Sequence, residues 1–359
     1  ENANFTEADV SNATLTSAKI VRTIFDKANL SSVIATSTTF TDVVATGADL
    51  TYANLTGSTI TNGDFQGASL LLAHFDNGNI NRTDFRDALM QYSTYTSTTL
   101  NTPQLEGADL TGANFTSATL TLPKAKGVNF TSAKFDKTTT TYMNASDAIF
   151  DKATITNSSF AILMAPKASM QDTNIDSSDF NQAQLQSVNF HNSTINGSSF
   201  SIANVPEGNF KNTYISNTDF TRSQLDFSDF TEAKITNSIF TNTDLTASDM
   251  TNALVKFTEF NETDLKNVTF KNADLTGSRL QTVDGQNLDV SGARLTGVVI
   301  TNSNLNGMDA RKADITGLDL SEQKFLSVNL TNSISSAWTK WPQGHSISST
   351  GSIPKKFLK

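Results

Sequence analysis

Few side chains in this sequence are suited to acid–base, nucleophilic or metal chemistry, and those few are scattered. There is no cysteine, which removes thiolate chemistry and disulfides. The three histidines, His74, His191 and His345, lie far apart along the chain. The sequence contains no phosphate-binding glycine loop and no HExxH, GxSxG or EF-hand pattern. It therefore predicts no catalytic residue, no cofactor and no metal site, and surface positions for the histidines.

Asp and Asn recur at a regular spacing, and their side chains can accept hydrogen bonds or carry negative charge. A series at intervals of twenty residues reads Asp9, Asn29, Asp49, Asp109, Asn129, Asn189, Asn209, Asp229, Asp249, Asp289, Asp309 and Asn329. Such side chains are typical of turns, where they accept hydrogen bonds from nearby backbone N–H groups. We expect a ladder of turn-stabilising groups. The alternative is a negatively charged strip that binds cations or imitates DNA phosphates.

The many N-x-[ST] sequons, such as those at Asn54 and Asn114, follow from the same spacing. Asn often precedes a large residue, and Thr or Ser often follows it, so the pattern itself generates the match. We interpret the sequons as a product of the repeat and not as glycosylation sites.

A repeat of five residues positions all of these side chains and runs from Phe5 to Leu330 without a shift of frame. Nearly every fifth residue is Leu, Ile, Phe, Val or Met, and we call this position i. The residue at i−2 is usually small. Apart from Tyr95, the exceptions at position i are Ala35, Ala45, Ala125, Thr140, Ala145, Ala165, Gly285 and Ala310.

Neither a helix nor one straight strand can use this period. Five residues advance an α-helix by about 500°, so the large side chains would spiral around it. In a strand, successive large residues would face opposite sides because five is odd. The pattern works if the chain turns after every five residues, with i−2 and i both pointing inward. The sequence thus predicts short extended sides joined by corners.

A longer period indicates how many sides complete one turn. From Phe150 to Phe270 every tenth residue is Phe or Met, and Ile recurs every twenty residues. A period of twenty predicts four sides per coil, with like residues stacked on successive coils. The predicted core columns are Phe160, Phe180, Phe200, Phe220, Phe240 and Phe260; Phe150, Phe190, Phe210, Phe230 and Phe270; and Ile155, Ile175, Ile195, Ile215 and Ile235.

The repeat resembles the pentapeptide-repeat family, whose consensus is A(D/N)Lxx. It stands here as ADLTG at 108–112, ANFTS at 113–117 and ADLTG at 273–277, and the resemblance covers roughly residues 1–334. The segment TKWPQG at 339–344 resembles a C-terminal tail common in the family. The resemblance implies an all-β fold, a right-handed quadrilateral parallel β-helix. With coils about 4.8 Å apart, about 16 coils would form a rod of about 77 Å.

The frame stops after Leu330, so we expect two regions. Residues 1–334 form the β-helix, and residues 335–359 form a cap and tail that includes Trp338, Trp341 and Pro342. At the other end, the chain begins with Glu1 inside the repeat, where no cap is visible. We expect a processing boundary or a partner there.

Irregular coils are expected between residues 100 and 170. Pro103 and Pro123 both occupy i−2, one coil apart, where each lacks a backbone donor. Either they are accommodated harmlessly or they mark a local widening or bend. Large core residues are replaced by small ones at Ala125, Thr140, Ala145 and Ala165, and Phe130, Phe135, Phe150 and Phe160 would compensate by filling the same layers.

Composition narrows the class of function. The net charge of −9 argues against a nucleic-acid binder, and the longest apolar runs are too short to span a bilayer. We expect a non-enzymatic structural or interaction protein with a protein partner, possibly itself end to end. It would act as a scaffold, a spacer or an assembling unit. The surface is rich in Thr, Ser and Asn, which favours an extracellular, periplasmic or cell-surface location over a cytoplasmic one.

Two other functions remain open. The family resemblance implies a DNA-mimicking inhibitor or protector of a type II topoisomerase, although interspersed lysines such as Lys134 and Lys152 dilute any negative face. Outward Thr residues, including Thr51, Thr56, Thr111, Thr116 and Thr131, would suit a repetitive surface that binds ice or a carbohydrate. Thr is also a good strand former, which accounts for them without a ligand.

Overall fold

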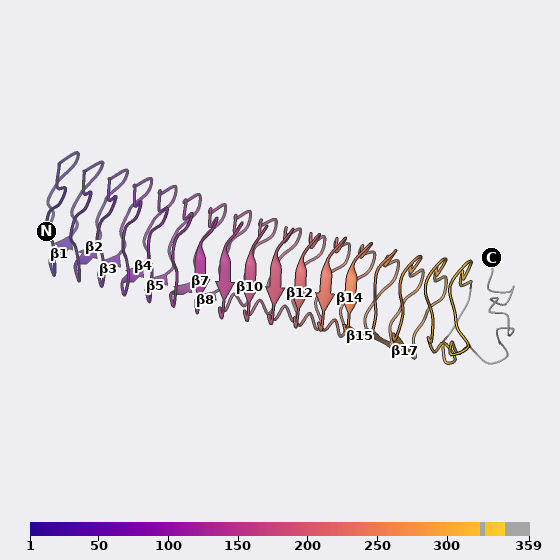
Figure 1. Cartoon of the computed structure of the whole chain (residues 1–359). Coiled ribbons are helices and arrows are strands. Elements are labelled where there is room, and N and C mark those ends of the chain that lie inside the picture. Colours follow the sequence, from indigo (N-terminus) through magenta and orange to yellow (C-terminus); the bar gives the residue numbers. More distant parts are fainter. Residues whose placement is uncertain (324–326, 342–359) are drawn as a thin grey trace. The chain divides into compact units, whose positions relative to one another are not determined.

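The computed structural model describes residues 1–323 and 327–341, and in this part of the chain all regular secondary structure is strand (Figure 1). The chain divides into two compact units, Glu1–Gln184 and Leu185–Lys359. The strands of the first unit are β1 (Lys19–Val21), β2 (Thr39–Thr41), β3 (Thr59–Thr61), β4 (Asn79–Asn81), β5 (Thr99–Asn101), β6 (Thr119–Thr121), β7 (Lys134–Asp136), β8 (Thr139–Thr141), β9 (Thr154–Thr156) and β10 (Asn174–Asp176). Those of the second unit are β11 (Thr194–Asn196), β12 (Tyr214–Ser216), β13 (Lys234–Thr236), β14 (Leu254–Lys256), β15 (Glu259–Asn261), β16 (Arg279–Gln281) and β17 (Val299–Thr301).

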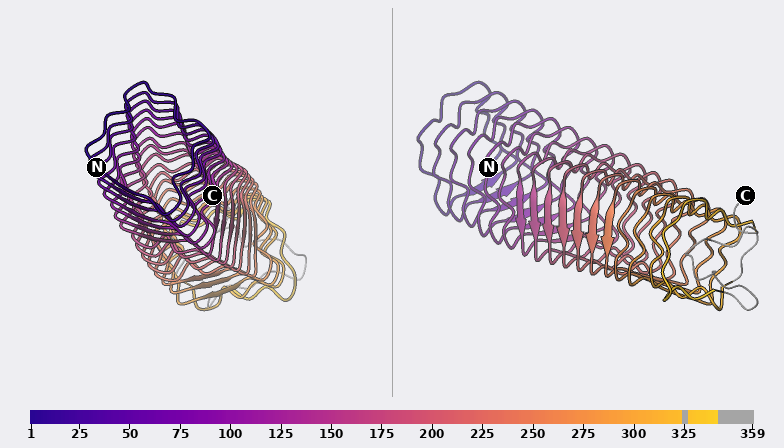
Figure 2. Two further views of the ribbon diagram at one scale, coloured as in Figure 1. Left: turned by 90° about the vertical axis from the view of Figure 1, so that its left-hand side faces the viewer. Right: turned by 45° about the vertical axis from the view of Figure 1, so that its right-hand side comes forward.

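Each coil takes twenty residues. In the first unit Ile20 pairs in parallel with Phe40, and in the second unit Phe260 pairs in parallel with Leu280. Isolated bridges join the other sides at the same offset, as between Asp9 and Asn29. Figure 2 shows these coils from two further directions. The fold is therefore the quadrilateral parallel β-helix that the period of twenty predicts.

The parallel sheets make about 14 turns, slightly fewer than the about 16 coils expected. Coils outside the strands are joined by single bridges, such as Asn4↔Ile24 and Asp309↔Asn329. Bridging continues to Asp319↔Lys340, which lies beyond the end of the β-helix predicted at residue 334.

Every corner depends on one residue in the left-handed backbone region. From Asn2 to Gly317 all residues at i+2 have φ between 48° and 75°. This conformation is ordinary for Gly and tolerated by Asn and Asp, but it costs other residues about 1–2 kcal/mol. Gly, Asn, Asp and Ser occupy most of these positions, so the residue types at i+2 of the repeat suit the left-handed conformation of the corners.

The corners are of two kinds, and the difference explains the prolines. At most corners the N–H at i−2 donates to the carbonyl of the preceding position i, as from Ala28 to Phe25 at 2.9 Å. Among the described coils of the first unit, the corners that follow β1 to β6 lack this bond. Pro103 and Pro123 occupy two of these corners, so no hydrogen bond is lost there. No described peptide bond is cis. The prolines are accommodated harmlessly.

The irregularity expected between residues 100 and 170 takes the form of a change of side. In the first unit, β1 to β6 and β8 form one sheet, whereas β7, β9 and β10 lie on the preceding side of the coil. After the change, the buried residue at the corner that follows each of these strands is Ser or Thr, which carries a hydroxyl group. Ser158 Oγ accepts a hydrogen bond from the backbone N–H of Thr138 at 2.9 Å and donates to the carbonyl of Thr156 at 2.7 Å. The hydroxyl thus replaces the missing carbonyl as partner.

The core is filled by stacked columns. The Phe and Ile columns named above are all buried. Rings one coil apart stack, as Phe210 and Phe230 do with centroids 4.5 Å apart and planes 4° apart. Rings of the two Phe columns meet edge to face, as Phe210 and Phe220 do at 6.3 Å and 88°. Such pairs stabilise a core by about 0.5–1.5 kcal/mol beyond their burial.

Small residues at position i are compensated mainly within the same side. Val43 precedes Ala45, and Leu163 precedes Ala165, and all four are buried. The large and small residues have simply exchanged places, which keeps the volume of the layer nearly constant. Phe130, Phe135, Phe150 and Phe160, which were expected to compensate, are buried and pack against one another.

Candidate interaction surfaces

The Asp and Asn series forms a ladder of turn-stabilising groups. Asp109 Oδ1 accepts hydrogen bonds from the backbone N–H of Thr111 at 3.0 Å and from its hydroxyl at 2.6 Å. Asn129 and Thr131 repeat this arrangement one coil later, with the same two distances. Coils are also linked directly, as where Asn29 Nδ2 donates to Asp9 Oδ1 at 3.1 Å. These side chains are used in holding corners, which supports the structural interpretation of the series.

Carboxylates gather in columns on the second unit, but cations interrupt them. Asp244, Asp264 and Asp284 follow one another along bridged sides. Lys266 Nζ lies 2.7 Å from Asp264 Oδ2 and 3.2 Å from Asp284 Oδ2. Arg311 similarly pairs with Asp309 at 2.6 Å. The strip is therefore partly neutralised.

Two carboxyl groups of the second unit have pKa values shifted in opposite directions. Partial burial raises the pKa of Asp226, and the nearby charges of Asp244 and Glu207 raise it further. Partial burial also acts on Asp309, but hydrogen bonds from the side chain and backbone of Arg311 outweigh it and lower the pKa of that carboxyl.

The histidines do not form a site. His74 Nδ1 lies 3.0 Å from Thr94 Oγ1 and 4.0 Å from Asp76 Oδ2 on the surface of the first unit. His191 belongs to the second unit, and His345 lies outside the described residues. Over residues 1–323 and 327–341, no group of three or more His, Asp or Glu side chains is placed to hold a metal ion.

The sheet of β1 to β6 and β8 presents a regular polar surface. Its outward side chains form two columns, and these carry no charge over β2 to β6 and β8. We call this part the Thr/Asn face, and it consists of Thr39, Thr41, Thr59, Thr61, Asn79, Asn81, Thr99, Asn101, Thr119, Thr121, Thr139 and Thr141. Successive members pair in register, Thr39 with Thr59 and Thr99 with Thr119. All are half-buried or exposed.

Sequence reasoning pointed to other threonines. Thr111, Thr116 and Thr131, which were expected to form the repetitive surface, direct their hydroxyls to the Asp or Asn two residues earlier. The Thr/Asn face was missed, although its signal is present in the sequence as TFT, TIT, NIN, TLN, TLT and TTT at intervals of twenty.

The first coil leaves part of its core open. Phe5 is 40% exposed, whereas Phe25, on which it stacks with ring centroids 5.4 Å apart, is 5% exposed. A hollow of about 280 Å³ opens there among apolar side chains that include Phe5, Val10 and Leu15.

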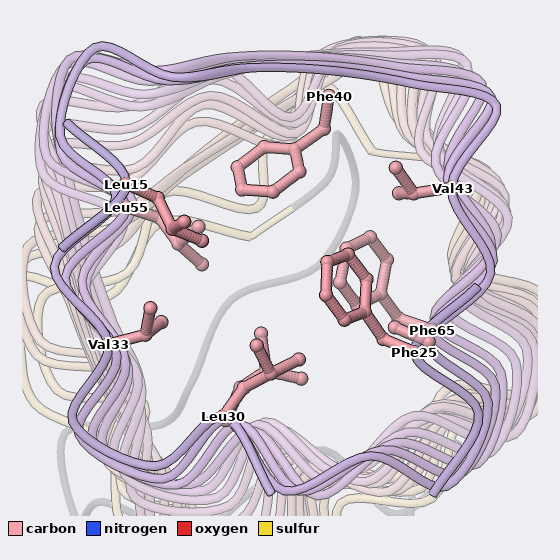
Figure 3. Close-up of a pocket in the computed structure, with 10 residues that line it drawn as sticks. Leu15, Phe25, Leu30, Val33, Phe40, Val43, Leu55 and Phe65 are labelled. Atoms are coloured by element: carbon pink, nitrogen blue, oxygen red, sulfur yellow. The ribbon is translucent and has the colours of Figure 1, made fainter. Parts of the chain in front are cut away.

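A small apolar cavity lies deeper in the same coils. It has a volume of about 20 Å³, and its lining is wholly apolar. Figure 3 shows Leu15, Leu30, Phe40 and Phe65 pointing into it from different sides of the coil. A space of this size holds at most one water molecule, and it offers no polar partner for one.

The last described residues, Lys340 and Trp341, return to the last coil. The Trp341 side chain is buried, and the preceding residue, Lys340, pairs with the coil through its N–H to Leu318 and its carbonyl to Leu320. Lys340 Nζ also lies 2.6 Å from Asp319 Oδ2. Trp338, the other tryptophan of the predicted cap and tail, is 80% exposed. Pro342 lies outside the described residues.

The coil of four five-residue sides, with a left-handed corner after each, defines a solenoid protein of the quadrilateral β-helix class. A family model of pentapeptide repeats matches in eight copies, at residues 1–31, 23–62, 53–91, 104–139, 167–201, 209–242, 242–281 and 289–325. The chain belongs to the pentapeptide-repeat family. No curated protein matches it in sequence.

Two solved structures match parts of this chain. QnrB1, described as a plasmid-mediated fluoroquinolone resistance protein, is 14% identical, with 47% of this chain and 94% of that one covered and a TM-score of 0.29. HetL from Nostoc sp. strain PCC 7120, involved in the regulation of heterocyst differentiation, is 18% identical, with 77% and 89% covered and a TM-score of 0.17. In the described residues of this chain no helix has the length and apolarity to cross a membrane.

Proposed function

We propose that this protein is a non-enzymatic structural or interaction protein that acts as a scaffold, a spacer or an end-to-end assembling unit. The observation that carries the proposal is the register of the coils. Backbone pairs fixed at an offset of twenty residues hold every outward side chain in a column. Such a solenoid presents a long, repetitive surface that is stable coil by coil.

The assembly contact that we propose joins coils of the same cross-section end to end. Phe5 is 40% exposed and would lie in such a contact. A contact between two different ends is heterologous, and repeated contacts of this kind form filaments. The location we propose is outside the cytoplasm, which is supported by the surface rich in Thr, Ser and Asn.

Light scattering combined with negative-stain imaging of the 1–359 chain at several concentrations tests this role. End-to-end oligomers that grow with concentration are expected. Replacement of Phe5 by Asp would abolish them, whereas the same change at the exposed corner residue Phe227 would not. A monomer at every concentration would rule out assembly and leave the spacer role.

The second candidate is an acidic surface that imitates DNA toward a type II topoisomerase. The columns of Asp residues on the second unit favour it, and the pairing of Lys266 and Arg311 with them weighs against it. A topoisomerase supercoiling assay with the purified chain tests this second candidate. Inhibition or protection that survives moderate salt would support this candidate.

A further inference from the structure

We propose that the Thr/Asn face binds ice. This inference does not depend on the assembly role, because it concerns a different surface of the first unit. It rests on the register of the face, on its unpartnered hydroxyls and on its lack of charge.

The face repeats in two directions. Along the coil axis its members follow one another at the spacing of parallel strands, about 4.8 Å, and along each strand the two columns lie about 6.6 Å apart. The register is continuous, since Thr39 pairs with Thr59, Thr59 with Asn79, and so on to Thr139. A ligand that uses the whole face must itself repeat in two dimensions.

The threonine hydroxyls of this face have no partner among the residues that the structure describes. No Thr of the Thr/Asn face forms a side-chain hydrogen bond with another described residue. Thr111 and Thr116, at the corresponding place on neighbouring sides, are bonded to Asp109 and Asn114. The cause is local, because the residue two positions before Thr41, Thr61, Thr121 and Thr141 is Thr and not the Asp or Asn that binds a hydroxyl elsewhere.

The asparagines extend the array without adding charge. Asn101 Nδ2 donates to Asn81 Oδ1 at 2.8 Å, and Asn81 Nδ2 donates to Asn79 Oδ1 at 2.9 Å. These bonds fix the amide groups of β4 and β5 in the same two columns. The face therefore offers a continuous set of oriented donors and acceptors beside the Thr methyl groups.

Charge complementarity selects a neutral ligand. The other sheet of the first unit carries Lys134, Asp136 and Asp176, and β15 to β17 carry Glu259 and Arg279. The Thr/Asn face carries no charge over β2 to β6 and β8. Ice is a neutral solid whose oxygen atoms repeat in two dimensions at spacings of similar size, whereas a single polymer chain repeats only along its length.

Partition into slowly growing ice tests the proposal with the whole 1–359 chain. The unaltered protein is expected to be enriched in the ice fraction. The double variant Thr99→Lys/Thr119→Lys places two charges on the face, and we expect its ice-bound fraction to fall about tenfold, which corresponds to about 1.4 kcal/mol. The matched control is Thr154→Lys/Asn174→Lys, which changes the same strand position on two neighbouring coils of the other sheet.

The control is expected to partition like the unaltered protein, and circular dichroism shows whether both variants keep the fold. Exclusion of the unaltered protein from ice would overturn the proposal, as would equal losses in the two variants. Sedimentation of the protein with microcrystalline cellulose or chitin, run in parallel, tests whether it binds other neutral crystalline surfaces. Binding to one of these without partition into ice would also overturn it and assign the face to a crystalline polysaccharide.

Discussion

The ring of Tyr92 lies directly over Gly112 on the next coil. A Cβ atom at Gly112 would come within 2.5 Å of Tyr92 Cδ1. Gly112 also has a φ of +68°. The glycine is thus required twice, once for its backbone conformation and once for the close approach of the ring.

Replacement of Gly112 by Ala is therefore expected to destabilise the protein by more than the about 1–2 kcal/mol that the left-handed conformation alone costs. Gly67 is the control, because its φ is +64° but no atom lies within 4 Å of its Cβ position. Thermal unfolding followed by circular dichroism measures both. Removal of the ring in Gly112→Ala/Tyr92→Ala should return the loss to that of Gly67→Ala, and a loss that stays larger would contradict the ring contact.

Large residues in the left-handed corners carry strain that glycine relieves. Ile202 is half-exposed with a φ of 58°, so Ile202→Gly is expected to stabilise the protein by about 1 kcal/mol. Ile239 is also exposed but lies on an extended side, so Ile239→Gly should destabilise it. Chemical denaturation of the two variants compares the effects, and two changes of the same sign would disprove the explanation.

The apolar cavity in the first coils predicts a gain on filling. Ala45 lines it, and Ala45→Val adds two carbon atoms that should stabilise the protein by about 1 kcal/mol. Ala145 is equally buried beside the larger Met143, so Ala145→Val should overpack its layer and cost about 1–3 kcal/mol. Melting temperatures separate the two outcomes, and a loss at both positions would mean that the cavity cannot accept a side chain.

The last coil should loosen in acid. Its hydrogen bond from Lys340, with a second from Ser321, lowers the pKa of Asp319 from 3.8 to about 2. Because the folded-state pKa is the lower one, the contact stabilises the coil above about pH 4 and is lost as the pH falls toward 2. The effect should be modest and reduced by salt, since both side chains are well exposed.

Fluorescence of Trp341 in a Trp338→Phe background measures this step. Asp319→Asn should remove the transition between pH 4 and pH 2, because the amide does not titrate there. A transition that persists in Asp319→Asn would assign the change to other carboxyl groups.

The repeat was readable from the sequence because position i alternates with small residues over its whole length, and the Phe period of ten fixes four sides per coil. The change of side at residues 134–141 was not readable as such. It depends on which corner residue can accept a freed N–H, and the contacts of Ser158 with Thr138 and Thr156 show that a hydroxyl does so.

The two prolines and the Thr/Asn face escaped prediction for the same reason. Whether an N–H at i−2 is needed, and whether a Thr hydroxyl is free, both depend on the corner that follows each side. Pro103 and Thr99 lie on either side of one such corner. The sequence repeat treats all corners as equal, whereas hydrogen bonding divides them into two kinds.

The offset of twenty residues has a mechanical consequence. Within each unit, a coil is held to the next by the same set of backbone bonds, so a force applied to a chain end meets the same resistance at every coil. Pulling should release one coil at a time, each lengthening the chain by up to about 66–72 Å. Under tension each unit would unfold in a series of equal extension steps, whereas a globular domain unfolds in one cooperative step.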